Sequence, residues 1–247
     1  MKQALSTIYS EHHRLLTPEG LWNILTFRGA TYGSPYAEND LQWFDTYEEW
    51  TDYYAASNKT FKGDKTQYFI NVAAYGMRNK HRNINNIAKY WDERHRWTSF
   101  IASKPDLKKT YKFLTQNHKG ESQKKVFPNI GPLTALLVCG DLIELKILEI
   151  PAIKDWAELI YDVQKGATLG LHSLALIGET FTKEDVIDAF TKLDSFLVQE
   201  LSDDDKLLMG YNMVMLEHGL CKFTRILTKA EKVSTHWKKP STTRKAS

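Results

Sequence analysis

The sequence predicts an all-α protein, and three observations support this. Apolar residues recur at spacings of three and four through most of the 247 residues, which is the period of an amphipathic helix. Helix-starting patterns also recur, as in Thr17-Pro18-Glu19, where a threonine precedes a proline of the first turn. We find no convincing strand pattern and no internal repeat. We therefore expect a single helical domain over residues 1–232 and a basic, disordered tail over residues 233–247.

The individual helices follow from the apolar spacing and from the residues that interrupt it. Loops are expected where glycine and other turn-forming residues gather, at 29–35, 59–65 and 166–170. Two further caps combine a hydroxyl with acidic residues in the first turn, at Thr182 and Ser202. The first expected helix starts at residue 17, and another starts at 182. The other expected helices span 40–56, 68–100 with a break near Arg82, 106–117, the later part of 122–145, 156–163 and 202–228.

Composition limits the class of protein. Hydrophobic residues make up 42% of the chain and the net charge is +3, which permits nucleic-acid binding without requiring it. No apolar run approaches the roughly 20 residues of a membrane span, and no signal peptide is evident. Cys139 and Cys221 lie in apolar helical patterns and are expected to be buried thiols. We expect a soluble protein of the cytoplasm, or of the host cytoplasm if it is viral, with no membrane partner.

The segment 126–137 predicts a tight hairpin that leads into an apolar helix. Asn129 tolerates a left-handed backbone, Gly131 lets another chain approach closely, and Pro132 suits a first helical turn. The free N–H groups at the start of such a helix favour an anion. The pattern matches the hairpin of a helix-hairpin-helix element, at about 122–145, which holds a DNA phosphate through main-chain amides. An ordinary helical corner is the alternative.

Lysines lie ahead of this hairpin and would supply the positive field that a phosphate-binding hairpin needs. A solvated surface face is the alternative. The cluster consists of Lys108, Lys109, Lys112, Lys119, Lys124 and Lys125. The residues that we expect to contact DNA are Asn129, Ile130, Gly131, Thr134, Lys124, Lys125 and Arg82.

Polar residues elsewhere in the helical patterns are candidates for chemistry. Arg78 and Arg82 share an expected helical face that could hold phosphates, or that could simply be solvated. Asp141 is expected to end the helix after the hairpin, an unfavourable place for a carboxylate unless it has a role.

Two further candidates lie in the second half of the chain. Lys165 precedes a glycine-containing loop whose amides could cradle phosphate oxygens, although most such loops are only turns. Glu217 and Cys221 share a helical face, and Gly219 between them suggests that another segment approaches closely there. Buried polar pairing with another helix is the alternative for Glu217.

These segments occur in an order that resembles a known family. The matching pieces are Asn71-Val72 with a downstream Arg78, Gly131 to Asp141, Trp156 with Gly166 to Leu171, and Leu220-Cys221-Lys222-Phe223. Together they resemble the DNA-glycosylase-like proteins of phage thymidine hypermodification over roughly residues 66–228. That family includes the 5-hydroxymethyluridine DNA kinases and the α-glutamyl/putrescinyl-thymine pyrophosphorylases, also called amino acid:DNA transferases.

The resemblance implies a DNA-glycosylase-like fold and a transferase that acts on a pyrophosphorylated 5-hydroxymethyl pyrimidine in DNA. The base would leave the stack, and an amine from an amino acid or a polyamine would displace pyrophosphate. The implied catalytic residues are Asp141 and Glu217 as carboxylates, with Arg78, Arg82 and Lys165 as cations on the leaving group. No cofactor and no metal are expected. The alternatives are a DNA kinase, for which we find no nucleotide-binding loop, and a non-catalytic helix-hairpin-helix DNA-binding protein.

Overall fold

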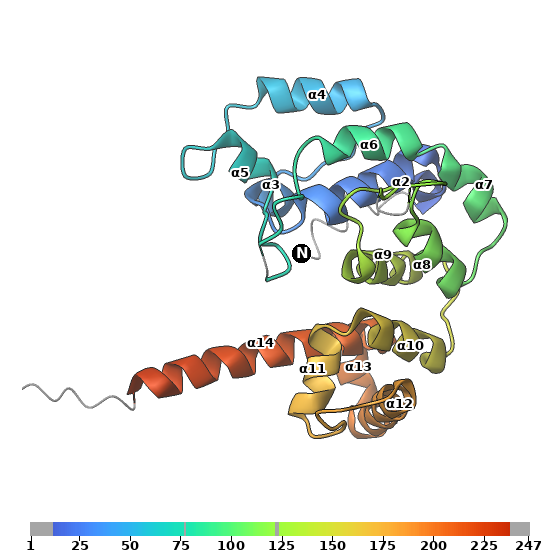
Figure 1. Cartoon of the computed structure of the whole chain (residues 1–247), viewed down its shortest axis with the longest axis vertical. Coiled ribbons are helices and arrows are strands. Elements are labelled where there is room, and N and C mark those ends of the chain that lie inside the picture. The colour runs from blue at the N-terminus through green and yellow to red at the C-terminus, as the bar shows by residue number, and fades with distance from the viewer. Residues whose placement is uncertain (1–11, 77, 122–123, 238–247) are drawn as a thin grey trace, which may run out of the picture. The chain divides into compact units, whose positions relative to one another are not determined.

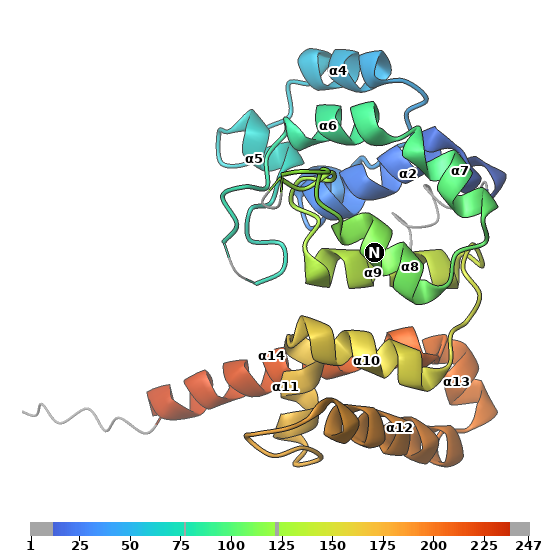
Figure 2. The ribbon, with the colours of Figure 1, turned by 45° about the vertical axis from the view of Figure 1, so that its right-hand side comes forward.

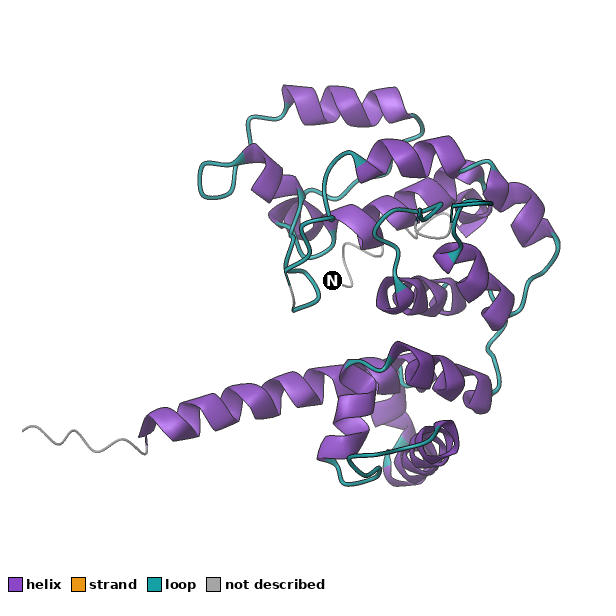
Figure 3. Cartoon of the chain, viewed as in Figure 1, coloured by secondary structure: helices purple, strands orange, loops and turns teal. Residues whose placement is uncertain are grey.

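A computed structural model describes residues 12–76, 78–121 and 124–237 of the chain (Figure 1). Throughout these residues the regular elements are helices, with two isolated bridges and no strand, so the expected all-α class is confirmed (Figure 3). The chain divides into two compact units, unit 1 (Met1–Pro151) and unit 2 (Ala152–Ser247). The division falls at Pro151, within a non-helical segment.

Unit 1 is built around α2 and η2, which pack against α6, while η2 also contacts α9 (Figures 1 and 2). Its helix starts include the expected ones: Thr17 accepts a hydrogen bond from the Gly20 N–H, and Asp106 caps α8. Its elements are η1 (His12–Leu16), α2 (Pro18–Leu25), η2 (Thr26–Thr31), α3 (Pro35–Asn39), α4 (Tyr47–Ala56), α5 (Lys65–Phe69), α6 (Asn86–Glu93), α7 (Arg96–Ala102), α8 (Leu107–Thr115) and α9 (Pro132–Glu144).

Aromatic side chains fill much of this unit. The indole N–H of Trp22 donates to the Ile87 carbonyl at 3.0 Å, and that of Trp97 donates to the Leu15 carbonyl at 3.1 Å. Both indoles are almost completely buried. Each buried indole therefore packs in the core while its polar atom is satisfied by backbone from another segment.

The helical region expected over 68–100, with a break near Arg82, is present only in its later part, as α6 and α7. The chain leaves the helical conformation at the end of α5 and regains it only at α6. In between, the side chains of Asn71, Asn79 and Asn83 each accept a hydrogen bond from the backbone N–H two residues further on. Such local bonds offer the backbone an alternative to the helix, and here that alternative prevails over the apolar spacing. The segment 40–56 is likewise helical only from Tyr47.

Unit 2 contains α10 (Ile153–Val163), α11 (Gly166–Ser173), α12 (Lys183–Glu200), α13 (Asp203–Met209) and α14 (Met213–Trp237). The capping box at Thr182 and the cap at Ser202 are both present as expected. The single helix expected over 202–228 is instead two helices, because Gly210 takes a left-handed conformation and ends α13. The last helix continues to Trp237, and residues 238–247 of the expected tail lie outside the described residues.

Candidate functional site

A buried ion pair marks the candidate site in unit 1. Arg28 donates from Nε to Oδ2 of Asp141 at 2.6 Å and from Nη2 to Oδ1 at 2.5 Å. Both side chains are buried, with the Arg28 residue 3% exposed and Asp141 6% exposed. The two parallel bonds are the forked geometry that a guanidinium forms with a carboxylate. The pair therefore joins η2 to α9 by a charged contact shielded from water.

Arg28 is carried on a π-helical stretch. The N–H of Tyr32 donates to the Phe27 carbonyl at 2.7 Å across this stretch, and all six residues of η2 are buried. A Cβ added at Gly29 would lie 2.4 Å from Oη of Tyr90 and 2.8 Å from Cδ1 of Ile130. A glycine at this position lets η2 lie against α6 and the hairpin before α9. Turns of π-helix occur often at functional sites, where they redirect side chains.

A second buried guanidinium lies beside the first. Arg82 is 3% exposed and donates from Nη2 to the backbone carbonyl of Arg28 at 3.1 Å. Its guanidinium carbon lies 4.7 Å from the centre of the Tyr75 ring. Its Nη1 atom is buried and has no hydrogen-bond partner among the described residues. A buried donor without an acceptor is costly, so this nitrogen would be stabilised by an anion or another acceptor beside it.

Tyrosine side chains complete the cluster. Tyr75 donates to the Arg28 carbonyl at 2.9 Å, and its ring stacks on Tyr32 with the centroids 5.1 Å apart. Burial raises the pKa of Tyr75, against the opposing effect of Arg28 and Arg82. Burial likewise raises the pKa of Tyr90, whose hydroxyl donates to the Pro128 carbonyl at 2.6 Å. Both phenols therefore stay protonated near neutral pH and act as hydrogen-bond donors.

The hairpin before α9 has the local geometry expected from the sequence. Asn129 is left-handed with φ of 63°, and Pro132 is the first residue of α9. Gly131 is the N-cap residue, no side chain caps this end, and a Cβ added there would meet no heavy atom within 4 Å. Main-chain N–H groups of the first turn lack partners within a helix. An approaching group can therefore reach the backbone at Gly131.

Other hairpin residues serve the fold. The Asn129 amide donates to the Gly29 carbonyl at 2.7 Å, and its oxygen accepts from the side-chain amide of Asn79. Ile130 and Thr134 are buried. Asn129 thereby fixes the hairpin to η2 and to the loop that carries Arg82. Contact of this hairpin with DNA stays a prediction.

The flanking basic residues differ in their freedom. Lys125 is half-buried and donates to the Thr115 carbonyl at 2.5 Å, so it ties the hairpin to α8. Lys124 is exposed and forms an ion pair with Glu121 at 3.3 Å. Arg78 is exposed on the loop between α5 and α6. The helical face expected to hold Arg78 and Arg82 together does not exist, because that loop is not a helix.

Asp141 does not end its helix as expected. It lies in the last turn of α9, which continues to Glu144. Both of its oxygens accept bonds from Arg28, which compensates its charge within the protein. The unfavourable placement seen in the sequence is thus offset by a buried guanidinium.

The glycine-containing loop expected after Lys165 is a helix, α11. Lys165 is the exposed N-cap residue of this helix. A Cβ at Gly166 would lie 2.6 Å from Sγ of Cys221, and one at Gly170 would lie 2.7 Å from the Leu220 carbonyl oxygen. The two glycines therefore allow α11 and α14 to cross closely. They are explained by helix packing, without a phosphate.

Glu217 lies on α14 and is buried. It accepts a hydrogen bond from Sγ of Cys221 at 3.0 Å, and Nε2 of His218 lies 3.7 Å from its carboxylate. Burial and the adjacent Glu217 carboxylate raise the pKa of the Cys221 thiol. The close approach expected at Gly219 is wrong, because a Cβ there would meet no heavy atom within 4 Å.

The sequence candidates thus fall into two groups. In unit 1, Asp141, Arg82 and Asn129 all bond to η2, whereas Lys165 and Glu217 belong to unit 2. The sequence reading missed Arg28, the centre of the unit 1 cluster. One feature of the sequence could have identified Arg28: it is a charged residue in a helical segment whose other members are small or apolar.

Comparisons with protein families, with curated proteins and with solved structures find no match for this chain. Within the described residues, no group of three or more His, Cys, Asp or Glu side chains is arranged to hold a metal ion. The helices of the described part of the chain include none with the length and apolar character needed to cross a membrane.

Proposed function

We propose that the protein binds DNA and acts on a pyrimidine within it, as a transferase that replaces a pyrophosphate group on the 5-methylene carbon by an amine. The observation that carries this proposal is the buried Nη1 of Arg82, for which the described residues offer no hydrogen-bond partner, on a side chain that also bonds to the backbone of Arg28. Two guanidinium groups and one carboxylate leave the cluster with an excess positive charge. A phosphoryl oxygen of the substrate would supply the missing acceptor.

The reaction assigns a role to each charged group of the cluster. The neutral amine nitrogen attacks the methylene carbon, the carbon–oxygen bond to pyrophosphate breaks, and pyrophosphate leaves with the electron pair. The product forms as a secondary ammonium, which exchanges its proton with solvent. Arg82 would stabilise the charge that develops on this leaving group. Asp141 has both oxygens occupied by Arg28, so we assign it to holding Arg28 in place instead of accepting a proton from the amine. The catalytic roles expected for Arg78, Glu217 and Lys165 stay predictions.

The hairpin supports the DNA part of the proposal. The uncapped backbone at Gly131 is open to an approaching phosphate, and the exposed Lys124 lies near it in the chain. Amides at the start of a helix favour an anion. Because Asn129 joins this hairpin to Gly29 of η2, a phosphate held there would place DNA close to the Arg28 cluster.

A non-catalytic DNA-binding protein is the second candidate. The ion pair between Arg28 and Asp141 favours this candidate, because both oxygens of Asp141 are occupied by Arg28. A carboxylate with a purely structural role would show the same contacts. In that case the hairpin would bind DNA while Arg82 served only the packing of its loop.

The two candidates separate in a product assay. DNA carrying pyrophosphorylated 5-hydroxymethyluracil is incubated with the protein and with amino acids or polyamines, and the nucleosides are then analysed by mass spectrometry. The transferase should yield an amine-substituted thymidine, and Arg82→Gln should lower its rate at least a hundredfold, roughly the worth of one positioned charge-stabilising donor. The matched control is Arg14→Gln, which removes a guanidinium paired with Asp45 on the surface. DNA binding without product would support the non-catalytic candidate and exclude the transferase.

A further inference from the structure

Unit 2 exposes apolar side chains next to acidic ones along α13. Leu207 and Leu208 are 83% and 78% exposed, and α13 has no buried residue. Residues 200–209 contain four acidic residues and one basic residue, Lys206, which pairs with Asp203 at 3.4 Å. Exposed apolar side chains that lie together and are bordered by charged residues mark sites of protein–protein contact. We call residues 200–209 the α13 surface.

The later part of α14 extends beyond the contacts that hold its earlier part. Thr224 still bonds to α11, since its Oγ1 donates to the Gly166 carbonyl at 3.3 Å, whereas Ile226 is 64% exposed. In both ribbon views the helix then runs past α11 and away from the other helices of unit 2 (Figures 1 and 2). Helices in proteins are stabilised mainly by the packing of an apolar face. The later part of α14 therefore presents a face that another surface would stabilise.

The sequence of this part of α14 combines an apolar row with basic residues. The apolar residues follow one another at alternating spacings of three and four, which is the period of a helix that packs against another helix. They are Phe223, Ile226, Ala230, Val233 and Trp237. Exposed basic residues lie beside them, namely Lys222, Arg225 and Lys229. Residues 222–247 contain eight Lys or Arg and one Glu, although the whole chain has a net charge of only +3. We call residues 222–237 the α14 arm.

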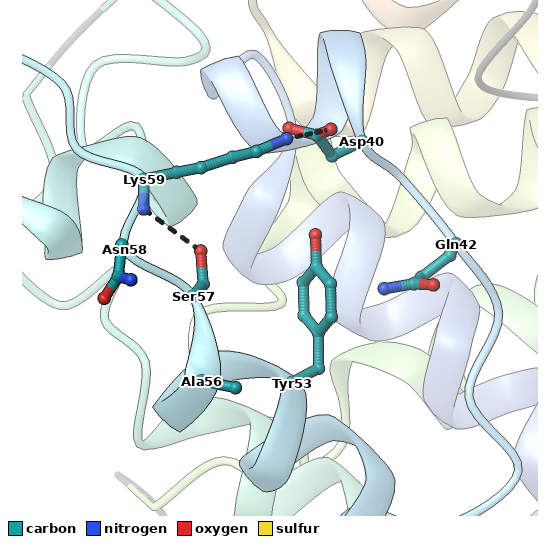
Figure 4. A pocket seen from close by; sticks show the side chains of 7 residues that line it. All are labelled: Asp40, Gln42, Tyr53, Ala56, Ser57, Asn58 and Lys59. Atoms are coloured by element: carbon teal, nitrogen blue, oxygen red, sulfur yellow. Dashed lines mark hydrogen bonds and ion pairs between the residues drawn. The ribbon is translucent and has the colours of Figure 1, made fainter.

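The polar pocket of unit 1 differs from these surfaces because its charges are compensated within the protein. It lies between the segment that follows α3 and the end of α4, where the Lys59 ammonium donates to the Asp40 carboxylate (Figure 4). The Tyr68 hydroxyl donates to the same carboxylate. The α13 surface and the α14 arm, by contrast, each carry an excess of one charge beside exposed apolar side chains. Their opposite charges favour contact with each other.

One copy of the chain cannot bring the two surfaces together. Three residues separate the end of α13 from the start of α14, so the α13 surface lies at the start of this helix. Ile226 lies about 20 Å further along the helix, at the α-helical rise per residue. We propose that two copies of the chain associate by exchange, with the α14 arm of each packed against the α13 surface of the other. The two contacts are then related by twofold symmetry, the commonest arrangement of identical subunits. This inference does not depend on the proposed transfer reaction.

Sedimentation of the full-length protein over a range of concentrations tests the association. The parent should shift from monomer to dimer as its concentration rises, and its dissociation constant should increase with NaCl because salt screens the charges. A parent that stays monomeric at every soluble concentration would overturn the proposal. If reversing the charges of Arg225 and Lys229 in such a monomer weakened its binding to duplex DNA, the α14 arm would belong to a DNA site instead.

Substitutions on each surface locate the contact. The double variant Leu207→Glu with Leu208→Glu, and the double variant Arg225→Glu with Lys229→Glu, should each raise the dissociation constant at least tenfold. The control Ile150→Glu, which replaces an apolar side chain that is 73% exposed outside both surfaces, should leave the dissociation constant unchanged. Circular dichroism confirms that each variant is folded, as expected for exposed positions. Association of either double variant as tight as that of the parent would overturn the proposal.

A mixture of the two double variants separates exchange from other contacts between copies. In the exchanged dimer, the intact α14 arm of one variant meets the intact α13 surface of the other. The mixture should therefore dimerise at least tenfold more tightly than either variant alone. A contact between two α14 arms, or between two α13 surfaces, would gain nothing in this way. A mixture that associates no more tightly than the separate variants would overturn the exchange.

Discussion

Replacing Asp141 by asparagine should destabilise unit 1 strongly. The substitution keeps the shape of the side chain but removes the charge that compensates Arg28, and it turns an amide N–H₂ toward one of the guanidinium donors. Removing one partner of a buried ion pair typically costs about 3–5 kcal/mol, because the remaining charge stays buried without compensation. Since Arg28 is 3% exposed, solvent can relieve little of this cost, and we expect a loss within that range.

The assay must report on unit 1 separately, because a chain with two compact units need not unfold in one step. Hydrogen exchange of peptides from α9, measured across a urea series, gives the free energy of opening for this unit. The double variant Arg28→Met with Asp141→Leu is the matched control, since replacing both charges by apolar groups is often close to neutral. If Asp141→Asn loses less than about 1 kcal/mol, or if the double variant loses more than the single one, the ion pair is not what holds η2 to α9.

Further substitutions test the close contacts and the thiol. Gly29→Ala should lower the stability of unit 1 by about 1–3 kcal/mol, because its Cβ would lie 2.4 Å from Oη of Tyr90; an unchanged melting temperature would contradict this contact. Gly170→Ala should cost unit 2 a similar amount, about 1–3 kcal/mol by the same overpacking, and exchange of α14 peptides measures it; wild-type protection would show that α11 and α14 do not cross so closely. Cys221 should react with iodoacetamide much more slowly in the native protein than in urea at pH 8, because its raised pKa leaves little thiolate below that pKa, and equal rates would refute the buried contact with Glu217.

The fold class and several helix starts could be predicted from the sequence because they depend on local chemistry. Apolar spacing indicated helices, including the one that begins at Leu107, and hydroxyl caps located the starts at Pro18, Lys183 and Asp203. The loop between α5 and α6 was not predictable from spacing alone. In this loop three asparagine side chains accept hydrogen bonds from the backbone and so compete with the helix. The spacing of apolar residues carries no information about such bonds.

The candidate site was only partly accessible from the sequence for a different reason. Asp141 stood out because a carboxylate in the last turn of an apolar helix needs compensation. Its partner Arg28 lies 113 residues earlier, and no local pattern links the two. The glycines at 166 and 170 illustrate the opposite error, since their spacing fits a phosphate loop and a close helix crossing equally well, and only the contact with α14 distinguishes them.

The most direct test of the central claim is the binding of two duplex oligonucleotides that differ only in one base, unmodified thymine or pyrophosphorylated 5-hydroxymethyluracil. If the buried Nη1 of Arg82 donates a hydrogen bond to a pyrophosphate oxygen, the parent protein should bind the modified duplex at least tenfold more tightly, a difference of about 1.4 kcal/mol. Arg82→Gln should remove this preference while leaving the affinity for the unmodified duplex within about twofold, since a hydrogen bond to a charged group is worth about 1.5–3 kcal/mol. Equal affinity of the parent protein for both duplexes, or a preference that survives in Arg82→Gln, would contradict the account.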